Sequence, residues 1–140
     1  MANQPPNAGI QVYTWEEFEV DARKIADTIK AWGKKFKYIY GPPRGGVILA
    51  VKLSHLLCPD RERKPGLPNN FGFMSFYMPE FWEKTLVVDD IADTGQTLWN
   101  FNNCGSFIVT LFKHPQSTIT PDIWIREKDD RWVQFPWEAP

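Results

Sequence analysis

The sequence predicts an α/β fold in which a mainly parallel sheet is flanked by helices. Segments typical of strands alternate with segments typical of helices along the chain, as they do in successive βαβ units. The two clearest strand segments, residues 85–88 and 107–112, are continuous apolar runs, which is typical of strands buried on both faces of a parallel sheet. With 140 residues, the chain is expected to form one compact domain spanning residues 1–140.

The first helix is predicted by signals at both of its ends. Residues 1–10 are expected to be a loose lead-in to this helix. Thr14 and Glu17 then have the spacing of a capping box, and apolar residues recur every three or four positions as far as Trp32. Gly33 fits the C-terminal stop of the helix.

A strand, a glycine-rich loop and a second helix follow, which is the beginning of a βαβ unit. The strand is expected at residues 38–40, the loop at 41–46 and the helix at 47–57. Residues 58–70 are rich in proline and are predicted to be a loop, and residues 71–77 are predicted to be a strand. The elements expected after these are a turn at 79–84, the strand at 85–88, a short helix at 97–102, the strand at 107–112, and short strands at 123–125 and 132–133.

Composition and charge narrow the class of protein. Hydrophobic residues make up 43% of the chain and charged residues 24%, as in ordinary globular proteins. A net charge of −1 without a basic block argues against nucleic acid or a membrane surface as the main partner. The N-terminus lacks the apolar segment of a signal peptide, and no apolar run approaches the roughly 20 residues of a transmembrane helix, so a cytoplasmic protein is expected.

The most unusual chemistry lies in residues 89–97, directly after the strand at 85–88. In open α/β sheets, ligands bind beyond the carboxyl ends of the strands. The turn at 93–97 offers consecutive backbone N–H groups, two threonine hydroxyls and a helix N-terminus, which together suit a phosphate monoester. Gly95 allows the backbone to approach such a group closely.

Charged side chains accompany this turn. Asp89 and Asp90 are adjacent and repel each other, so we interpret them as acceptors for a vicinal diol, with a cation nearby. Asp93 has an alternative role as a helix N-cap. Arg44, in the loop at 41–46, can grip two pyrophosphate oxygens at once, and the alternative is a surface arginine in a turn.

The run from Val87 to Thr97 resembles the signature with which type I phosphoribosyltransferases bind phosphoribosyl pyrophosphate. Within that superfamily, the chain is most similar to the bacterial xanthine-guanine phosphoribosyltransferases. The further matching segments are Tyr13-Thr14-Trp15, Asp21-Ala22-Arg23-Lys24, Arg44-Gly45-Gly46, residues 107–113 and residues 132–138. The resemblance implies the type I phosphoribosyltransferase fold, a mainly parallel twisted sheet flanked by helices with a reduced hood. It also implies an unusual peptide bond in the loop that carries Arg44.

The resemblance further implies a purine salvage reaction, in which ribose 5-phosphate moves from phosphoribosyl pyrophosphate to guanine, xanthine or hypoxanthine and pyrophosphate is released. Asp93 is then the expected catalytic residue, which accepts the proton lost from the purine. The residues expected to bind phosphoribosyl pyrophosphate are Arg44, Gly45, Gly46, Asp89, Asp90, Ala92, Asp93, Thr94, Gly95, Gln96 and Thr97. Mg²⁺ is the expected cofactor, held by Asp89, Asp90 and Glu138, although Glu138 stands where the family typically has aspartate.

Base binding is expected at the end of the strand at 107–112 and in the C-terminal segment 118–138. Lys113 would donate to the purine O6, Trp132 would stack on the purine face, and the Val133 backbone would read the 2-position. For Lys113 the alternative is a solvated lysine at the end of a strand. For Trp132 the alternative is a tryptophan packed in a local aromatic core with Phe135 and Trp137. The two histidines of the chain have no role in this mechanism and are interpreted as surface or loop residues.

One segment departs from the family pattern. The family usually carries a long mobile loop before the signature strand, whereas only residues 78–84 are available here. A shorter loop excludes water less well, which predicts slower turnover or a lid from a neighbouring subunit. Two other functions therefore stay open: a transferase for another base, such as a pyrimidine or a modified purine, and a non-catalytic nucleotide-binding regulator. The resemblance also predicts a homo-oligomer, a dimer or a tetramer.

Overall fold

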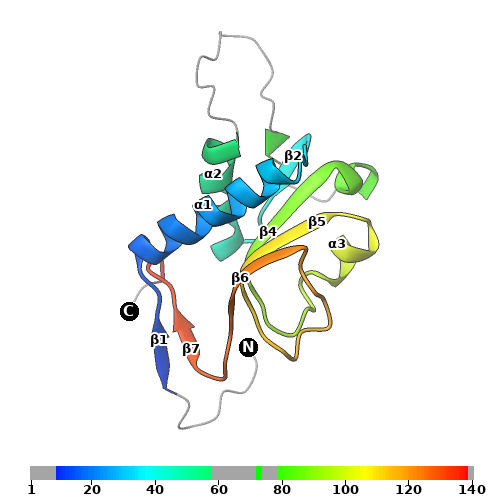
Figure 1. Cartoon of the computed structure of the whole chain (residues 1–140). Coiled ribbons are helices and arrows are strands. Elements are labelled where there is room, and N and C mark those ends of the chain that lie inside the picture. The colour runs from blue at the N-terminus through cyan, green and yellow to red at the C-terminus, as the bar shows by residue number, and fades with distance from the viewer. Residues whose placement is uncertain (1–8, 58–71, 74–78, 139–140) are drawn as a thin grey trace.

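The computed structural model describes residues 9–57, 72–73 and 79–138, and Figure 1 shows the whole chain. The elements are β1 (Ile10–Val12), α1 (Trp15–Ala31), β2 (Tyr38–Tyr40), α2 (Gly45–Leu57), β3 (Gly72–Phe73), the 3-10 helix η1 (Pro79–Lys84), β4 (Thr85–Ala92), α3 (Trp99–Asn103), β5 (Phe107–Lys113), β6 (Ile123–Glu127) and β7 (Trp132–Gln134). No helix in the described ranges is both long and apolar enough to cross a membrane.

The main sheet has five strands in the order β3-β2-β4-β5-β6, and every neighbouring pair is parallel. This arrangement confirms the predicted α/β class with a parallel sheet. In the register of β4 and β5, Val88 lies opposite Val109 and Ala92 lies opposite Lys113. The chain therefore leaves both strands at the same edge of the sheet, and the residues that follow each strand meet there.

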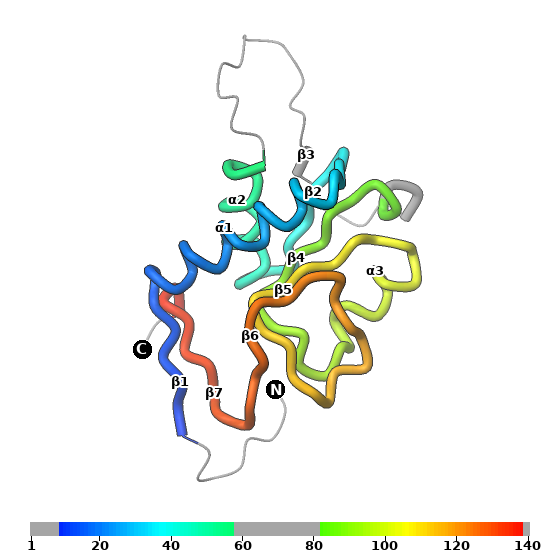
Figure 2. Tube along the Cα trace, viewed as in Figure 1, coloured from blue at the N-terminus to red at the C-terminus, as the bar shows by residue number. Residues whose placement is uncertain are grey.

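The alternation of side chains along β4 shows why this strand is apolar on both faces. Leu86 and Val88 belong to the core cluster that contains the buried side of α1 and α2. Val87 belongs to a second cluster on the other face, together with Trp82 of η1 and Leu98 beside α3. Figure 1 and Figure 2 show the same division, with α1 and α2 on one side of the strands and α3 on the other.

A second, two-stranded sheet joins the two ends of the chain. β1 pairs with β7 in parallel, so that Ile10 lies opposite Trp132. The N–H of Tyr13 continues this pairing by donating to the Gln134 carbonyl at 3.0 Å. The predicted lead-in of residues 1–10 is therefore wrong at residue 10, because this segment becomes ordered by pairing with residues far along the chain.

Several element boundaries differ from the prediction. The capping box at Thr14 and Glu17 is present, with both of its hydrogen bonds. The short helix predicted at 97–102 is α3, which begins at Trp99 after the turn of the signature loop. Of the strand predicted at 71–77, β3 is the described part, and the loop predicted at 58–70 lies outside the described residues.

The segment before β4, predicted to be a turn, is the 3-10 helix η1. Its Trp82 is completely buried, with ring centroids 4.8 Å from Phe101 and 5.3 Å from Tyr40. The Ser106 hydroxyl donates to the Trp82 carbonyl at 2.8 Å. Trp82 thus anchors η1 in the second core cluster, directly before the N-terminal end of β4.

An ion pair between the buried Asp21 and the half-buried Arg126 ties α1 to β6. Asp21 is fully buried and accepts hydrogen bonds from the Tyr13 hydroxyl at 2.7 Å and from the Arg126 Nε at 2.6 Å. The Arg126 guanidinium also lies over the Tyr13 ring, 5.3 Å from its centroid. Burial and the bond to Asp21 raise the pKa of Tyr13 well above its usual value, so the phenol keeps its proton and remains a donor.

Asp21→Ala is expected to lower the free energy of unfolding by about 1–3 kcal/mol, because it leaves the buried Tyr13 phenol without its acceptor. The half-buried Arg126 guanidinium loses its shortest ion pair but keeps Glu17 at 3.5 Å. Urea unfolding monitored by circular dichroism measures this loss. Asp27→Ala on the exposed side of the same helix is the matched control and is expected to change stability by less than about 0.5 kcal/mol. Equal stabilities of the two variants would contradict the structural role of Asp21.

Candidate active site

The loops that follow β2 and β4 lie side by side at the carboxyl edge of the sheet, because these two strands are neighbours. A Cβ atom on Gly46 would lie 2.7 Å from the Val88 carbonyl oxygen and 2.9 Å from Pro42 Cδ, so only glycine fits there. The peptide bond between Pro43 and Arg44 is cis, and this is the unusual bond that the family resemblance implies. Arg44 itself is exposed and forms no ion pair within the described part of the chain.

The glycine next to Arg44 packs directly against the acidic pair of β4. A Cβ atom on Gly45 would overlap the carboxylate of Asp90. The loop predicted to hold pyrophosphate and the acids predicted to hold the ribose therefore meet without an intervening side chain. Local sequence patterns place the two motifs in different loops, and the sheet order brings them together.

Alanine at these two glycines is expected to have different effects. Gly46→Ala pushes against backbone, so we expect a loss of about 1–3 kcal/mol in the free energy of unfolding. Gly45→Ala overlaps the side chain of Asp90 and not backbone, so we expect a smaller loss of stability than for Gly46→Ala, while displacement of Asp90 lowers turnover about 10-fold or more. Thermal unfolding and steady-state kinetics of both variants check this, and the opposite pattern would contradict the packing described for Gly45.

Asp89 and Asp90 lie inside β4, whereas the local sequence pattern predicts a strand that ends before them. β4 is four residues longer than predicted, and Asp89 is 8% exposed beside Thr110 of β5. The Asp90 N–H donates to Asp89 Oδ1 and the Ile91 N–H donates to Asp90 Oδ1, both at 2.8 Å. Burial, reinforced by the charge of Asp90, raises the pKa of Asp89 well above its usual value, and burial also raises the pKa of Asp90.

Glu138, near the C-terminus, belongs to the same electrostatic environment. Burial raises its pKa, the charge of Asp90 adds to this rise, and Arg44 partly offsets it. The Glu138 N–H donates to the Phe135 carbonyl at 3.1 Å, and Phe135 stacks on Trp137 with their centroids 4.7 Å apart. Glu138 therefore lies within range of the charges of Asp90 and Arg44.

The acidic residues provide the hard oxygen donors that Mg²⁺ prefers. Within residues 9–57, 72–73 and 79–138, however, no group of three or more acidic, histidine or cysteine side chains is arranged to hold a metal ion. Mg²⁺ is commonly bound by one or two carboxylates together with substrate phosphates. The acidic pair fits this mode, in which the substrate completes the coordination.

The turn predicted to bind phosphate, residues 93–97, packs against the segment that follows β5. Gly95 has φ of +90°, and a Cβ atom there would lie 2.7 Å from the Thr118 hydroxyl and 2.8 Å from the Ile119 nitrogen. The Thr118 N–H and hydroxyl donate to the Thr94 carbonyl at 3.0 and 3.1 Å. The Gln96 N–H donates to the Thr94 hydroxyl at 3.3 Å.

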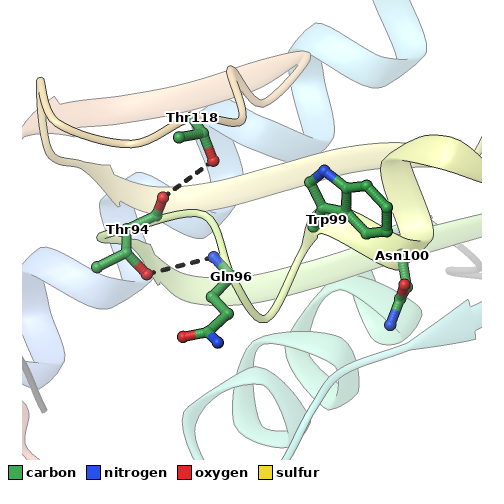
Figure 3. A pocket seen from close by; sticks show the side chains of 5 residues that line it. All are labelled: Thr94, Gln96, Trp99, Asn100 and Thr118. Atoms are coloured by element: carbon green, nitrogen blue, oxygen red, sulfur yellow. Dashed lines mark hydrogen bonds between the residues drawn. The ribbon is translucent and has the colours of Figure 1, made fainter.

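An open pocket of ≈ 460 Å³ lies beside this turn, and Figure 3 shows its lining. Two of the lining residues, Thr94 and Gln96, come from the signature. Trp99, Asn100 and Thr118 complete it, and the Trp99 indole is 55% exposed. The volume is within the range of ligand pockets in proteins, so the turn faces space that a small ligand can enter.

Asp93 follows β4 directly and is half-buried. The alternative role of a helix N-cap does not apply, because the N-cap position of α3 is Leu98 and has no side-chain hydrogen bond. The Asp93 carboxylate instead accepts a hydrogen bond from Gln116 Nε2 at 2.9 Å. Gln116 and Thr118 are not among the predicted site residues, because nothing in the local sequence after β5 indicates that this turn packs against residues 93–95.

The residues expected to bind the base are spread over two elements. Lys113 ends β5 with its Nζ over the Trp124 ring, 5.5 Å from the centroid. Trp132 and Val133 lie in β7. Phe135 and Trp137 stack on each other, but the Trp132 ring contacts no other aromatic ring of the described residues, so the alternative of a shared aromatic core does not hold.

The parallel sheet and the paired loops at its carboxyl edge agree with the type I phosphoribosyltransferase fold that the resemblance implies. No protein-family model matches the chain. Among solved structures, the chain is similar to a purine phosphoribosyltransferase from Pyrococcus horikoshii, with a TM-score of 0.69 and 24% identity over 93% of this chain and 94% of that one. It is also similar to the xanthine-guanine-hypoxanthine phosphoribosyltransferase of Helicobacter pylori, with a TM-score of 0.71 and 18% identity over 94% and 93%.

A third similar structure is a hypothetical protein from Neisseria gonorrhoeae solved with bound ppGpp. Its TM-score is 0.65, with 18% identity over 94% of this chain and 90% of that one. All three matches extend over nearly the whole length of both chains. The comparison thus establishes that this chain has the type I phosphoribosyltransferase fold.

Proposed function

We propose that the protein is a purine phosphoribosyltransferase, which transfers ribose 5-phosphate from phosphoribosyl pyrophosphate to guanine, xanthine or hypoxanthine. The observation that carries this proposal is the direct packing of Gly45 against Asp90. This contact brings the arginine loop beside the acidic pair, and the phosphate turn follows within a few residues. The three groups match the pyrophosphate, the ribose hydroxyls and the 5′-phosphate of one substrate.

In the proposed reaction, a purine nitrogen forms a bond to the anomeric carbon while the bond to pyrophosphate breaks. Pyrophosphate departs with the electron pair, and the purine loses a proton to Asp93. Positive charge develops on the ribose ring, near the carboxylates of Asp89 and Asp90, which stabilise it electrostatically. Arg44 binds the negative charge that develops on the leaving group.

The remaining residues bind and orient. Backbone N–H groups of Thr94 to Thr97 hold the 5′-phosphate and so fix the position of the sugar. Lys113 and the β7 residues Trp132 and Val133 would select the base. Asp89 and Asp90 would hold Mg²⁺ together with the substrate phosphates, and the ion would neutralise charge on pyrophosphate when bound. The expected third ligand, Glu138, forms no metal-binding group with them in the described part of the chain.

A second candidate function is a nucleotide-binding regulator with the same fold. The observation that favours it is the similar Neisseria structure, which contains bound ppGpp. Such a ligand offers phosphates and a purine, the same groups that the proposed site would bind. The two functions differ in whether a base and phosphoribosyl pyrophosphate react.

The test is a spectrophotometric assay with phosphoribosyl pyrophosphate, Mg²⁺ and, in separate reactions, guanine, xanthine, hypoxanthine, adenine, uracil and orotate. Turnover of one or more 6-oxopurines, with little for the other bases, is the expected result. Turnover only with uracil or orotate would replace the proposal with a pyrimidine transferase. No turnover with any base, together with calorimetric binding of ppGpp, would replace it with the regulator.

A further inference from the structure

We infer that Gln116 is a positioning residue for Asp93, an inference that rests on the proposed function. Gln116 lies in the turn after β5, and Asp93 lies in the turn after β4. The Gln116 side-chain Nε2 donates to Asp93 Oδ1 at 2.9 Å. The carboxylate of the proposed catalytic residue is thus held by a side chain that the phosphate and acid motifs do not include.

The two turns are joined on both sides of this contact. The His114 N–H donates to the Ala92 carbonyl at 2.9 Å, and the Thr118 N–H donates to the Thr94 carbonyl at 3.0 Å. Gln116 and Asp93 each lie at the middle of their paired segment. The two backbone hydrogen bonds therefore fix the distance between the turns, and this distance allows the Gln116 side chain to reach the Asp93 carboxylate.

His114 holds the backbone of Gln116. The Gln116 N–H donates to His114 Nδ1 at 3.1 Å, so this ring nitrogen must be unprotonated. His114 Nε2 therefore carries the ring hydrogen and donates to Asp130 Oδ1 at 3.1 Å. The His114 side chain is only 13% exposed, which limits its freedom to leave this position. Asp130, His114, Gln116 and Asp93 form one chain of hydrogen bonds that ends at the proposed catalytic carboxylate.

The chemistry of the contact explains how Gln116 would act. An amide NH₂ group donates and cannot accept, so it binds one carboxylate oxygen without taking a proton from it. Within the described part of the chain, Asp93 Oδ2 has no hydrogen-bond partner. Gln116 thus fixes the plane of the carboxylate and leaves its second oxygen available to accept the purine proton.

The test is a kinetic comparison of Gln116→Met and Gln116→Glu with the wild type, using the 6-oxopurine that the wild type turns over. Methionine keeps the length of the side chain but cannot donate, so kcat is expected to fall about 10-fold while KM for phosphoribosyl pyrophosphate stays within about 2-fold. Glutamate puts a second negative charge beside Asp93, so a fall of about 100-fold is expected. Asn103→Leu, an amide-to-apolar change at the exposed end of α3, is the control and is expected to leave kcat unchanged.

A double-mutant cycle with Asp93→Asn separates positioning from a general structural effect. If Gln116 acts through Asp93, adding Gln116→Met to Asp93→Asn should lower kcat by less than about 2-fold further. Equal losses in both backgrounds, or an active wild type whose kcat Gln116→Met does not change, would overturn this inference and leave the proposed function standing. A wild type that is inactive with every base would overturn both.

Discussion

Asp93→Asn is expected to lower kcat by roughly 10²–10⁴-fold, with KM for phosphoribosyl pyrophosphate changed by less than about 3-fold. Asparagine keeps the shape of the side chain and can still accept the hydrogen bond from Gln116 through its carbonyl oxygen. It cannot accept the proton that the purine loses. The substitution therefore removes the proposed base and preserves the arrangement of the turns.

Steady-state kinetics and thermal unfolding of this variant are the measurements. An unchanged Tm together with the loss of kcat would assign the effect to chemistry. Asp27→Asn, on the exposed side of α1, is the control and should be as active as the wild type. A kcat of Asp93→Asn close to that of the wild type would contradict the role of Asp93 as the proton acceptor.

Asp89→Asn is expected to lower turnover by roughly 10²–10³-fold and, in the absence of Mg²⁺, to raise Tm at neutral pH. Asparagine can still accept the hydrogen bond from the Asp90 N–H, so the backbone of β4 should not change. The substitution removes a buried charge that lies beside a second carboxylate.

The gain in stability depends on pH because the folded protein raises the pKa of Asp89 above its unfolded value. Below about pH 3.9, the usual aspartate pKa, Asp89 is protonated in both the folded and the unfolded protein, and the fold has its full stability. As pH rises through the higher folded-state pKa, the folded protein has to ionise a buried carboxyl group, and that stability is lost. Asparagine does not titrate. The difference in Tm between Asp89→Asn and the wild type should therefore grow from pH 4 to pH 8.

Thermal unfolding of both proteins at several pH values, with and without Mg²⁺, measures this difference. Added Mg²⁺ is expected to stabilise the wild type more than the variant at pH 8, since a divalent cation offsets the buried carboxylate charge. A lower Tm for Asp89→Asn at every pH would contradict the electrostatic account of the acidic pair.

The sequence predicts those parts of the fold whose signals are local. The apolar runs of β4 and β5 and the capping box at Thr14 follow from side-chain patterns within a few residues, and the structure confirms them. The pairing of β1 with β7 was missed, because Ile10 and Trp132 are far apart in sequence and neither strand has a strong local pattern. The end of β4 was also misplaced, because buried acids such as Asp89 are rare in strands and resemble the start of a loop.

The sequence motifs of the candidate site could be predicted, but the way in which they come together in space could not. The signature around Asp93 and the loop of Arg44 are visible in the sequence, but the contact between Gly45 and Asp90 depends on the order of the strands. Gln116 carries no local signal at all. Its relation to Asp93 arises only because β4 and β5 end at the same edge of the sheet.

The most direct test of the central claim is to follow phosphoribosyl pyrophosphate by ³¹P nuclear magnetic resonance in the presence of the protein, Mg²⁺ and the three 6-oxopurines. We expect pyrophosphate and nucleoside 5′-monophosphate to appear in equal amounts, and only when a base is present. Phosphoribosyl pyrophosphate that remains intact, or that decays at the same rate without a base, would contradict the proposal that this protein is a purine phosphoribosyltransferase.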